Sequence, residues 1–568
     1  MDYKKYIAEK INIEGVSKEE LYDLISLPPN TEMGDYALPC FKFAKLLRKS
    51  PVMIAEEIKT SITSDVTILS DKVLSEVSAV NGYVNFKVNK DEFVRETLEK
   101  ILKEKENFGS SNEGEGKTIC LDYSSINIAK PFHIGHLSTT VLGGALYRIF
   151  KYLGYKTVGI NHLGDYGTQF GKLISAYKRW GNKETIEQGG IRALNELYVK
   201  FHQEAEEHPE YDDEARAYFK KIEEGDEECL ALFHWFKELT LKDVQKNYDM
   251  LDIHFDSYAG ESFYSDKMQP IVDELKEKGL LIESRGAQVV DLEEYGMSPC
   301  IILKSDGTSL YATRDMAAAA YRKKEYDFDK CLYVVAYQQN LHFKQFFKVL
   351  ELVGKDWAKD LVHVAYGMVS LEEGTMSTRK GNVVFLEDVI NKCIEKAYTI
   401  LKDKNPDLEN KEDVAKKVGV GAVIFGALYN SKIKDIVFSY DKVLNFDGET
   451  SVYVQYTCAR ANSVLQKGGT PETFKIPANL SMEEFELTKA LATFPETVKA
   501  AAEKYEPSYI ARFAVDVAQK FNKFYFDCKI LSAEDEQTKE FRLALTNATL
   551  CTLRNAFALL GIGIPEKM

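Results

Sequence analysis

One stretch of the chain, residues 118–154, constrains the fold more than any other. It starts with a β-rich run, Thr118 to Tyr123, passes through a polar loop, and enters a segment whose apolar residues recur at the spacing of an amphipathic helix. These apolar residues are Leu137, Val141, Leu142, Ala145, Leu146, Ile149, Phe150 and Leu153. Gly154 is a good C-terminal stop for that helix, and Thr157 to Ile160 is typical of a strand. A strand–loop–helix–strand unit predicts a right-handed crossover in a parallel sheet.

The loop inside this unit carries two imidazoles at the expected start of the helix, in His133-Ile134-Gly135-His136. A helix N-terminus with nearby basic groups is a suitable place to hold phosphate. Two other readings stay open: a pair of zinc ligands, although no third Cys or His lies close in sequence, and a pair of capping side chains on an ordinary helix. The neighbours Asn127 and Lys130, with room for a flat base beside Gly135, favour a nucleotide site.

A second loop strengthens that interpretation. Residues 366–389 contain Met376-Ser377-Thr378-Arg379-Lys380-Gly381 after an expected strand. Basic side chains on a glycine-bounded loop suit a triphosphate that is clamped and then released, whereas the alternative is a solvated basic surface loop. We infer that both loops flank one cleft at the carboxyl ends of a parallel sheet.

Composition limits the class of protein. The 568 residues predict several domains, and 45% apolar with 28% charged residues is ordinary for a soluble chain. No apolar run is long enough to cross a membrane, and no signal-peptide core is found near the start. Nine cysteines without a C-x-x-C pair predict a reducing, cytoplasmic location and neither disulfides nor a zinc ribbon. The net charge of −15 lies within the first 450 residues, so it does not exclude RNA binding elsewhere.

The pattern along the chain predicts an α/β Rossmann-type domain with a helical insertion, an α+β N-terminal domain and an all-α C-terminal domain. Asn81-Gly82 predicts a hairpin turn, and strands of parallel type are expected to alternate with helices through Ile390. The expected segments are an N-terminal domain at 1–110, a split Rossmann domain at 111–190 and 286–390, a mainly helical insertion at 191–285, a helical connector at 391–450 and a helical domain at 451–568.

Several motifs in order resemble those of one family. His133-Ile134-Gly135-His136 and the preceding run 124–131, SSINIAKP, resemble the nucleotide-site signature of class I aminoacyl-tRNA synthetases, and specifically of arginyl-tRNA synthetases. Further similar runs are NHLGDYGTQFG (161–171), YATRD (311–315), LHFKQ (341–345), MSTRKGNVV (376–384) and VYVQYTCAR (452–460). The resemblance covers essentially the whole chain.

The resemblance implies an enzyme that activates L-arginine with ATP to an arginyl-adenylate, releases diphosphate, and transfers arginine to tRNA(Arg) with release of AMP. Catalysis would be electrostatic, by positive groups around the α-phosphate, with Mg²⁺ arriving with ATP and no structural metal. The implied catalytic residues are Lys130, His133, His136, Arg379 and Lys380. The implied ATP-binding residues are His133, Gly135, His136, Met368, Met376 and Ser377.

A guanidinium requires carboxylates and acceptors in a planar arrangement. The resemblance implies that these come from Asp122, Ser124, Asn127, Tyr311, Asp315 and Gln339. By itself, Asp315 could equally be the N-cap of a helix, and Asp122 a solvent-facing carboxylate at the end of a strand.

The sequence departs from the family pattern in its second loop. The class signature Lys-Met-Ser-Lys-Ser reads here Thr375-Met376-Ser377-Thr378-Arg379, so Thr378 replaces the lysine that contacts the triphosphate. The resemblance implies that Lys130 supplies the missing charge. Ile126 and Asn340 also differ from the common residues, and Lys567 stands where arginine is frequent.

For tRNA, the resemblance implies contacts from the start of the last helical domain and the end of the chain. The residues are Tyr453, Gln455, Tyr456, Arg460, Asn462 and Met568. Aromatic and amide side chains can stack on and read unpaired bases, although half-buried core tyrosines are the alternative. The N-terminal domain would contact the outer corner of the tRNA. A monomer with no membrane association is expected.

Two other functions remain to be weighed. A cysteinyl enzyme of the same class should carry thiolate and imidazole zinc ligands around its pocket, and no such cluster occurs in the sequence. A catalytically inactive tRNA-binding paralogue should have lost His136 or the guanidinium carboxylates, and these residues are present.

Overall fold

The computed structural model describes all residues except 1–2, 27, 29–32, 65–72, 306, 308–309, 372–383 and 472. Its contacts divide the chain into two compact units. The first unit comprises residues 1–108, 461–493 and 519–552, and the second comprises 109–460, 494–518 and 553–568. Each unit is described by itself below.

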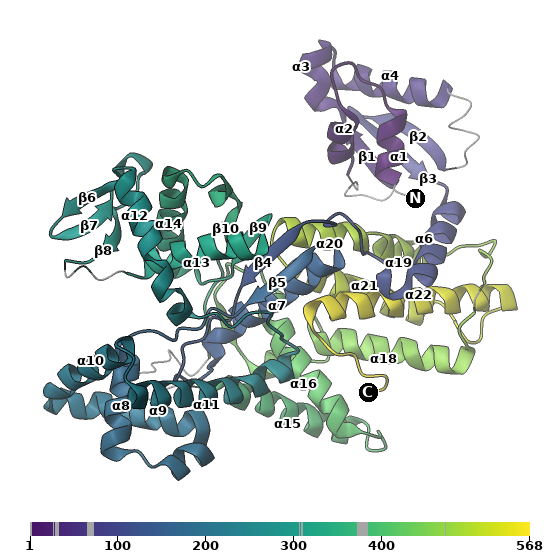
Figure 1. Cartoon of the computed structure of the whole chain (residues 1–568). Coiled ribbons are helices and arrows are strands. Elements are labelled where there is room, and N and C mark those ends of the chain that lie inside the picture. The colour runs from purple at the N-terminus through teal and green to yellow at the C-terminus, as the bar shows by residue number, and fades with distance from the viewer. Residues whose placement is uncertain are drawn as a thin grey trace. The chain divides into compact units, whose positions relative to one another are not determined.

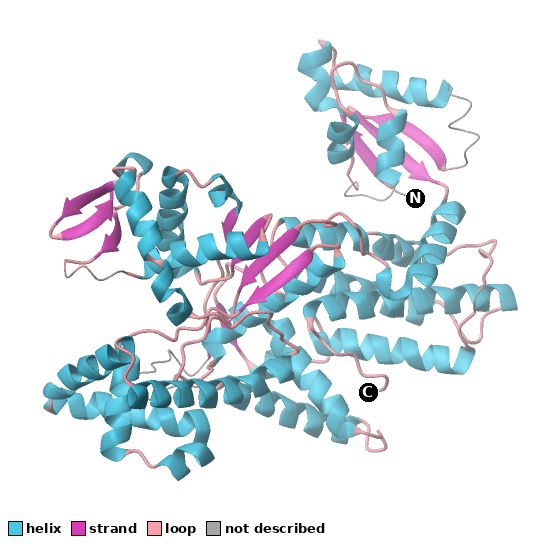
Figure 2. Ribbon diagram, viewed as in Figure 1, coloured by secondary structure: helices cyan, strands magenta, loops and turns pink. Residues whose placement is uncertain are grey.

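A three-stranded antiparallel sheet, in the order β1-β3-β2, organises the N-terminal part of the first unit (Figure 2). Asn81 and Gly82 join β2 to β3 with φ of 51° and 83°, the left-handed values of a tight hairpin turn, which confirms the predicted hairpin. The elements are α1 (Tyr3–Lys10), α2 (Lys18–Leu24), β1 (Tyr36–Pro39), α3 (Ala44–Leu47), α4 (Pro51–Ser64), β2 (Leu74–Val80), β3 (Tyr83–Val88) and α6 (Lys90–Glu104).

Helical segments from the C-terminal region complete the first unit. Helix α19 (Met482–Ala492) packs on α6, where the rings of Phe93 and Phe485 lie 5.9 Å apart. Glu484 is fully buried, and its Oε1 lies 2.7 Å from Nε of Arg542. Helices α18 (Ser451–Gly468), α21 (Ser508–Asp527) and α22 (Glu536–Leu560) each contribute part of their length to this unit.

A four-stranded, all-parallel sheet organises the second unit, with the order β10-β9-β4-β5 (Figure 1). Its strands are β4 (Thr118–Asp122), β5 (Lys156–Ile160), β9 (Lys330–Tyr333) and β10 (Leu361–His363). Helix α7 (Leu137–Tyr152) connects β4 to β5, which confirms the predicted strand–helix–strand unit and its parallel sheet.

Helix α7 is more deeply buried than an amphipathic helix. Its residues from Leu137 to Leu146 are all buried, including the serine, threonine and glycine positions between the apolar ones. Small residues allow this, because a Cβ at Gly143 would overlap the Tyr123 ring and one at Gly144 would overlap Ile253. The prediction of a solvent-exposed polar face along this part of the helix is therefore wrong, because other parts of the second unit cover it.

Strands β6 (Leu281–Ser284), β7 (Ala287–Val290) and β8 (Cys300–Leu303) do not join the parallel sheet. They form a separate antiparallel sheet in the order β6-β7-β8, so the expectation of parallel strands in this region is wrong. The reason is local. Arg285 and Gly286 alone connect β6 to β7, with φ of 51° and 80°, and a parallel pair needs a crossover of roughly a dozen residues or more.

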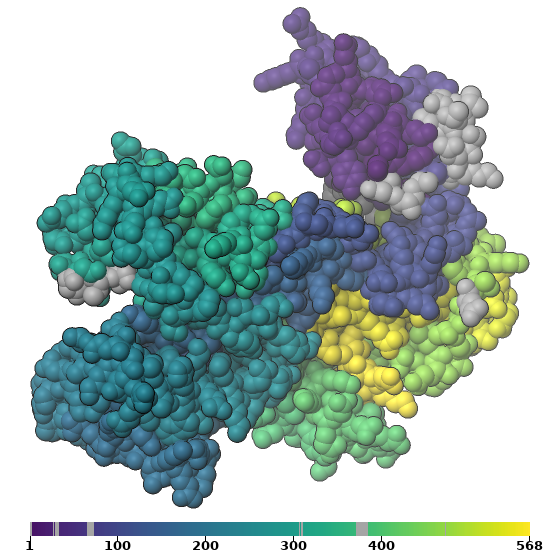
Figure 3. All heavy atoms as spheres, viewed as in Figure 1, coloured from purple at the N-terminus to yellow at the C-terminus, as the bar shows by residue number. Residues whose placement is uncertain are grey.

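Helices dominate the rest of the second unit. In the space-filling view, the insertion helices and the segment that holds β6–β8 stand out as two lobes (Figure 3). A short parallel pair of β11 (Val369–Leu371) and β12 (Ile436–Phe438) interrupts the helical region. The helices are α8 (Thr168–Trp180), α9 (Lys183–Glu207), α10 (Glu210–Glu223), α11 (Glu227–Leu251), α12 (Gln269–Glu277), α13 (Tyr311–Tyr326), α14 (Asn340–Val353), α15 (Leu386–Lys404), α16 (Lys411–Leu428), α17 (Tyr440–Val443) and α20 (Phe494–Glu503).

One helix among the described residues, α22, is long and apolar enough to cross a membrane by length and composition. Of its most apolar window, 78% is buried inside the protein. This burial is typical of a core helix, so α22 is weak support for a membrane span.

Candidate active site

The two histidines of the loop after β4 cap the start of the helix that follows it. Nδ1 of His133 accepts the backbone N–H of Gly135 at 3.0 Å, and Nδ1 of His136 accepts the backbone N–H of His133 at 3.2 Å. The two rings lie 4.1 Å apart. The capping role left open by the sequence is therefore present, and it does not exclude a phosphate role because each ring keeps its Nε2.

The capping bonds determine the tautomer of both rings. A ring nitrogen that accepts a hydrogen bond carries no proton, so each neutral imidazole holds its proton on Nε2 and can donate from there. Burial lowers the pKa of His133 to about 4, and the ammonium of Lys130 adds to the effect. Burial, followed by the charge of His133, lowers the pKa of His136 to about 3. Both imidazoles are thus neutral N–H donors near pH 7.

The loop between β4 and the histidines is held by helix α11 of the insertion. Thr240 accepts the backbone N–H of Ala129 at 3.0 Å, and the hydroxyl of Tyr248 lies 2.8 Å from Oγ of Ser124. Ser124, Ser125 and Ala129 have φ of 68°, 43° and 61°, which shows how tightly the backbone turns here. Ser124, predicted to bind arginine, is buried in this hydrogen-bond network.

Four carboxylates gather at the carboxyl ends of the parallel strands. Asp122 ends β4, and its Oδ2 lies 2.7 Å from Nη2 of Arg322 on α13. Asp315, on the same helix, lies with Oδ2 2.6 Å from Nε2 of His342 and with Oδ1 3.9 Å from Nε2 of His162. Burial opposes ionisation of Asp315, but the hydrogen bond from His342 and nearby positive groups hold its pKa below the usual value.

The helix N-cap alternative for Asp315 is wrong, because α13 begins at Tyr311 with Leu310 as its N-cap. The ring of Tyr311 lies 4.7 Å from that of His342 and is 56% exposed, so it borders the cluster while remaining open to a ligand. The solvent-facing alternative for Asp122 is also wrong, since its side chain is buried.

The other two carboxylates of this region have cationic partners. Lys237 of α11 lies 2.7 Å from Oδ2 of the buried Asp165, and Arg314 lies 2.7 Å from Oε2 of Glu261. Burial raises the pKa of Glu261 to about 7, although Arg314 acts in the opposite direction.

His162, His342 and Arg322 belong to the cluster but are not among the site residues that the sequence predicts. The two histidines lie inside runs that the family resemblance covers, NHLGDYGTQFG and LHFKQ, so a signal for them existed. Arg322 lies outside every quoted motif.

The remaining predicted ligands of arginine and adenine are more exposed than Asp122 and Ser124. Asn127 and Gln339 are exposed, and the backbone of Asn127 forms a bridge with Gly164. Met368 is half-buried, and its backbone N–H donates to Oδ1 of Asp435 at 2.7 Å.

The second predicted loop lies outside the described residues, including Met376, Ser377, Arg379 and Lys380. The chain directly after it is described and pairs with the histidine turn. The backbone N–H of Ile134 donates to the carbonyl of Val384 at 3.2 Å, and that of Leu386 donates to Phe132 at 2.9 Å. This pairing places Val384 beside the histidine turn, and the inference that the two loops flank one cleft stays a prediction.

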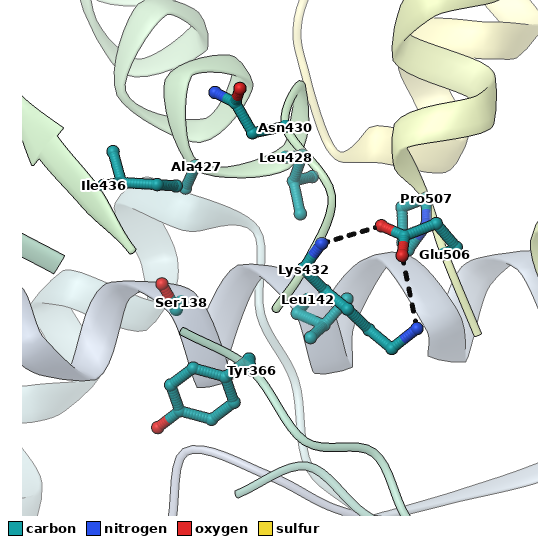
Figure 4. Close-up of a pocket in the computed structure, with 10 residues that line it drawn as sticks. All are labelled: Ser138, Leu142, Tyr366, Ala427, Leu428, Asn430, Lys432, Ile436, Glu506 and Pro507. Carbon is teal, nitrogen blue, oxygen red and sulfur yellow. Dashed lines mark hydrogen bonds and ion pairs between the residues drawn. The ribbon is translucent and has the colours of Figure 1, made fainter. Parts of the chain in front are cut away.

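A small cavity lies between helix α7 and the loop that precedes β12 (Figure 4). Its volume of about 10 Å³ admits roughly one water molecule, so it is not a substrate pocket. Glu506 closes one side, where its carboxylate accepts the backbone N–H of Lys432 at 2.9 Å and the Lys432 ammonium at 3.2 Å.

The residues predicted to contact tRNA differ in exposure. Tyr456 is 41% exposed and lies under the guanidinium of Arg460 at 5.1 Å, whereas Tyr453 is half-buried. Gln455 is fully buried, and its amide donates to the carbonyls of Lys417 and Gly563. The expectation that Gln455 presents its amide to a base therefore disagrees with this structure.

Asn462 and Met568 are both half-buried. The carbonyl of Met568 accepts a hydrogen bond from Asn405 at 3.2 Å, and its side chain packs on a core cluster of α15 and α16.

Comparison with known proteins matches every part of the chain. Residues 97–440 match the family described as tRNA synthetases class I (R), catalytic domain. Residues 1–88 match the arginyl tRNA synthetase N terminal domain, and residues 454–568 match the DALR anticodon binding domain.

Close relatives and solved structures agree with these matches. The chain is 54% identical to the arginine–tRNA ligase of Clostridioides difficile and 53% identical to that of Clostridium beijerinckii, in each case over the full length of both chains. Its fold matches the arginyl-tRNA synthetase of Thermus thermophilus with a TM-score of 0.79 and 25% identity over 96% of each chain. The enzyme from Plasmodium falciparum matches with a TM-score of 0.78 over 96% of this chain and 94% of that one. The catalytic-domain model of this class thus matches more than half of the chain, and the relatives are similar over their full length. The chain therefore belongs to the class I arginyl-tRNA synthetase family.

Proposed function

We propose that this chain attaches L-arginine to tRNA(Arg) in two steps. ATP and arginine first form arginyl-adenylate and diphosphate, and the arginyl group then moves to the terminal adenosine of the tRNA with release of AMP. The observation that carries the proposal is that the histidine turn follows β4, and that Asp122, which ends the same strand, belongs to the carboxylate cluster.

For ATP, we assign the phosphates to the Nε2–H groups of His133 and His136 and to the ammonium of Lys130. Fixed donors that do not reorganise as charge develops stabilise a transition state well. Gly135 and Met368 flank the adenine in this proposal. Met376, Ser377, Arg379 and Lys380 complete the triphosphate site in our assignment, on the strength of the family resemblance alone.

Mg²⁺ comes to this site with ATP in our proposal. No group of three or more His, Cys, Asp or Glu side chains suitable for a metal occurs among the described residues, so no step is assigned to a protein-bound ion.

For arginine, Asp315 and Asp122 supply the carboxylates of the pocket. Tyr311, which borders the cluster, and the exposed amides of Asn127 and Gln339 orient the substrate at the rim. Ser124 supports the pocket through its bonds to Tyr248 and Thr140 at 2.8 and 2.9 Å.

For tRNA, the exposed Tyr456 and the neighbouring Arg460 are the strongest candidates for base contacts, because an exposed aromatic ring can stack on an unpaired base. Tyr453, Asn462 and Met568 remain proposed contacts. We place the protein in the cytoplasm as a monomer.

The test is exchange of diphosphate into ATP with each amino acid in turn, with and without tRNA, followed by charging of tRNA(Arg) with labelled arginine. Exchange that depends on arginine, together with charging, is the expected result. Exchange with cysteine, or tRNA binding without any exchange, would overturn the proposal. No finding favours the inactive paralogue, since the histidines and carboxylates of the site are present.

A further inference from the structure

The guanidinium of Arg322 is buried in the site of an enzyme proposed to bind a guanidinium substrate. The residue is 1% exposed, and its guanidinium lies 5.3 Å from the centre of the Tyr333 ring. Its Nη2 has two partners, and its Nε and Nη1 have no hydrogen-bond partner among the residues that the structure describes. Such burial of a permanent cation is costly, so the pair it makes with Asp122 must balance most of that cost.

Both carboxylate oxygens of Asp122 already have a partner in this chain. Oδ1 accepts the hydroxyl of Ser125 at 2.6 Å, and Oδ2 lies 2.7 Å from Nη2 of Arg322. A carboxylate that holds a buried guanidinium in this way has its charge neutralised locally.

Arg322 also determines the orientation of His162. Its Nη2 lies 3.3 Å from Nδ1 of His162. A guanidinium can only donate, so Nδ1 must accept, and the proton of the neutral ring lies on Nε2. That Nε2 faces Oδ1 of Asp315 at 3.9 Å.

Asp315 differs from the other carboxylates of the cluster. Asp122, Asp165 and Glu261 each have an arginine or lysine within 2.7 Å, whereas the ion-pair partners found for Asp315 are the imidazoles of His162 and His342. The arginine and lysine side chains of these ion pairs are thus bound by the other three carboxylates and not by Asp315. A substrate guanidinium would supply the balancing charge.

We propose that Arg322 is a positioning residue for substrate recognition: by binding Asp122 and orienting His162, it makes Asp315 the carboxylate that meets the substrate guanidinium. This inference rests on the proposed function. It assigns Asp122 to the support of Arg322 and leaves direct recognition to Asp315.

The first experiment measures arginine-dependent diphosphate exchange, with saturating tRNA, in the full-length Arg322→Gln variant. We expect the KM for arginine to rise about 10-fold or more, while the KM for ATP and kcat change less than about threefold. An unchanged KM for arginine in this variant would overturn the inference. Absence of exchange in the wild-type protein would instead overturn the proposed function.

The second experiment separates support from direct contact. Asp122→Asn alone leaves Arg322 buried without its partner, so we expect a raised KM for arginine. The double variant Asp122→Asn/Arg322→Gln replaces the charged pair by a neutral one, and we expect its KM to return to within about threefold of wild type. If Asp122 contacts the substrate directly, the double variant stays at least as impaired as Asp122→Asn, and the inference is wrong.

A matched control separates positioning from general loss of stability. Arg542 forms a 2.7 Å pair with the fully buried Glu484 in the first unit, so Arg542→Gln also breaks a buried arginine–carboxylate pair. We expect it to lower the denaturation midpoint and leave the KM for arginine unchanged. If Arg322→Gln does not fold, the double variant alone decides: a KM near wild type supports the inference, and a strongly raised KM contradicts it.

Discussion

The carboxylate of Glu506 receives both the backbone N–H and the side-chain ammonium of Lys432, at 2.9 and 3.2 Å. The carbonyl of Lys432 in turn accepts the N–H of Gly367 at 2.7 Å. Strand β12 begins just after this loop and pairs with β11, which directly precedes residues 372–383. Glu506 thus holds the loop from which β12 starts.

We expect Glu506→Ala to lower the free energy of unfolding by about 2 kcal/mol, because the part-buried N–H of Lys432 loses its acceptor and the ammonium keeps only the carbonyl of Lys504. Lys432→Ala removes only the ammonium and should cost less, since the backbone hydrogen bond to Glu506 remains. Urea denaturation of both variants measures the difference. Equal losses would mean that the backbone hydrogen bond contributes little.

The two capping histidines should oppose folding at acid pH. Their folded-state pKa values of about 4 and 3 lie below the ordinary histidine value of 6.5, so the unfolded chain binds protons first as the pH falls. The stability that they contribute is present above pH 6.5 and is lost as the pH falls towards 4, by up to about 1.4 kcal/mol per pH unit for each group.

Urea denaturation at several pH values between 7 and 4 measures this loss. The double variant His133→Gln/His136→Gln should show a shallower decline than wild type over the same range. Identical slopes would contradict the low pKa values. Nitrogen NMR of the wild-type imidazoles at pH 7 should find the proton on Nε2 in both rings.

Substitution of two adjacent glycines in α7, Gly143 and Gly144, should destabilise the protein to different degrees. A Cβ at Gly143 would overlap the base of the Tyr123 ring, which cannot move without disturbing the core. A Cβ at Gly144 would meet chiefly the terminal methyl of Ile253, which can rotate away. We expect Gly143→Ala to cost about 1–3 kcal/mol or more and Gly144→Ala clearly less, by thermal or urea unfolding. The reverse order would show that this packing is wrong.

Lys130 should be unusually sensitive to substitution. If it replaces the charge missing at Thr378, Lys130→Ala should lower kcat for arginine-dependent diphosphate exchange by about 10²-fold. Lys151→Ala, at an exposed position in the last turn of α7, is the control and should retain near-normal exchange. Near-normal exchange by Lys130→Ala would remove Lys130 from the catalytic assignment.

Two neighbouring residues of α18 should respond in opposite ways. Tyr456→Ala removes an exposed ring and should raise the KM for tRNA in charging assays with little loss of stability. Gln455→Ala removes a buried amide that bonds two backbone carbonyls and should lower the denaturation midpoint. A raised KM for tRNA in Gln455→Ala alone would contradict this division.

The features predicted correctly from the sequence depend on residues close together in the chain. Asn81-Gly82 forms a hairpin because both residues tolerate positive φ, and the run from β4 through α7 to β5 follows from local periodicity and a short crossover. The capping geometry of His133 and His136 likewise involves backbone groups within three residues. The turn at Arg285-Gly286 is a similar local signal, and it fixes the antiparallel pairing of β6 with β7.

The sequence by itself therefore determined the fold class and the family, since each rests on ordered local motifs. Only the tertiary structure decided which polar groups meet. Arg322 and His162 are 160 residues apart in the chain, and no periodicity relates them. They meet because α13 packs against β4, where Arg322 pairs with Asp122, and β4 lies beside β5, which leads to His162. The same dependence on packing buries Gln455 and surrounds α7 from Leu137 to Leu146, since burial is a property of the assembled core and not of any single segment.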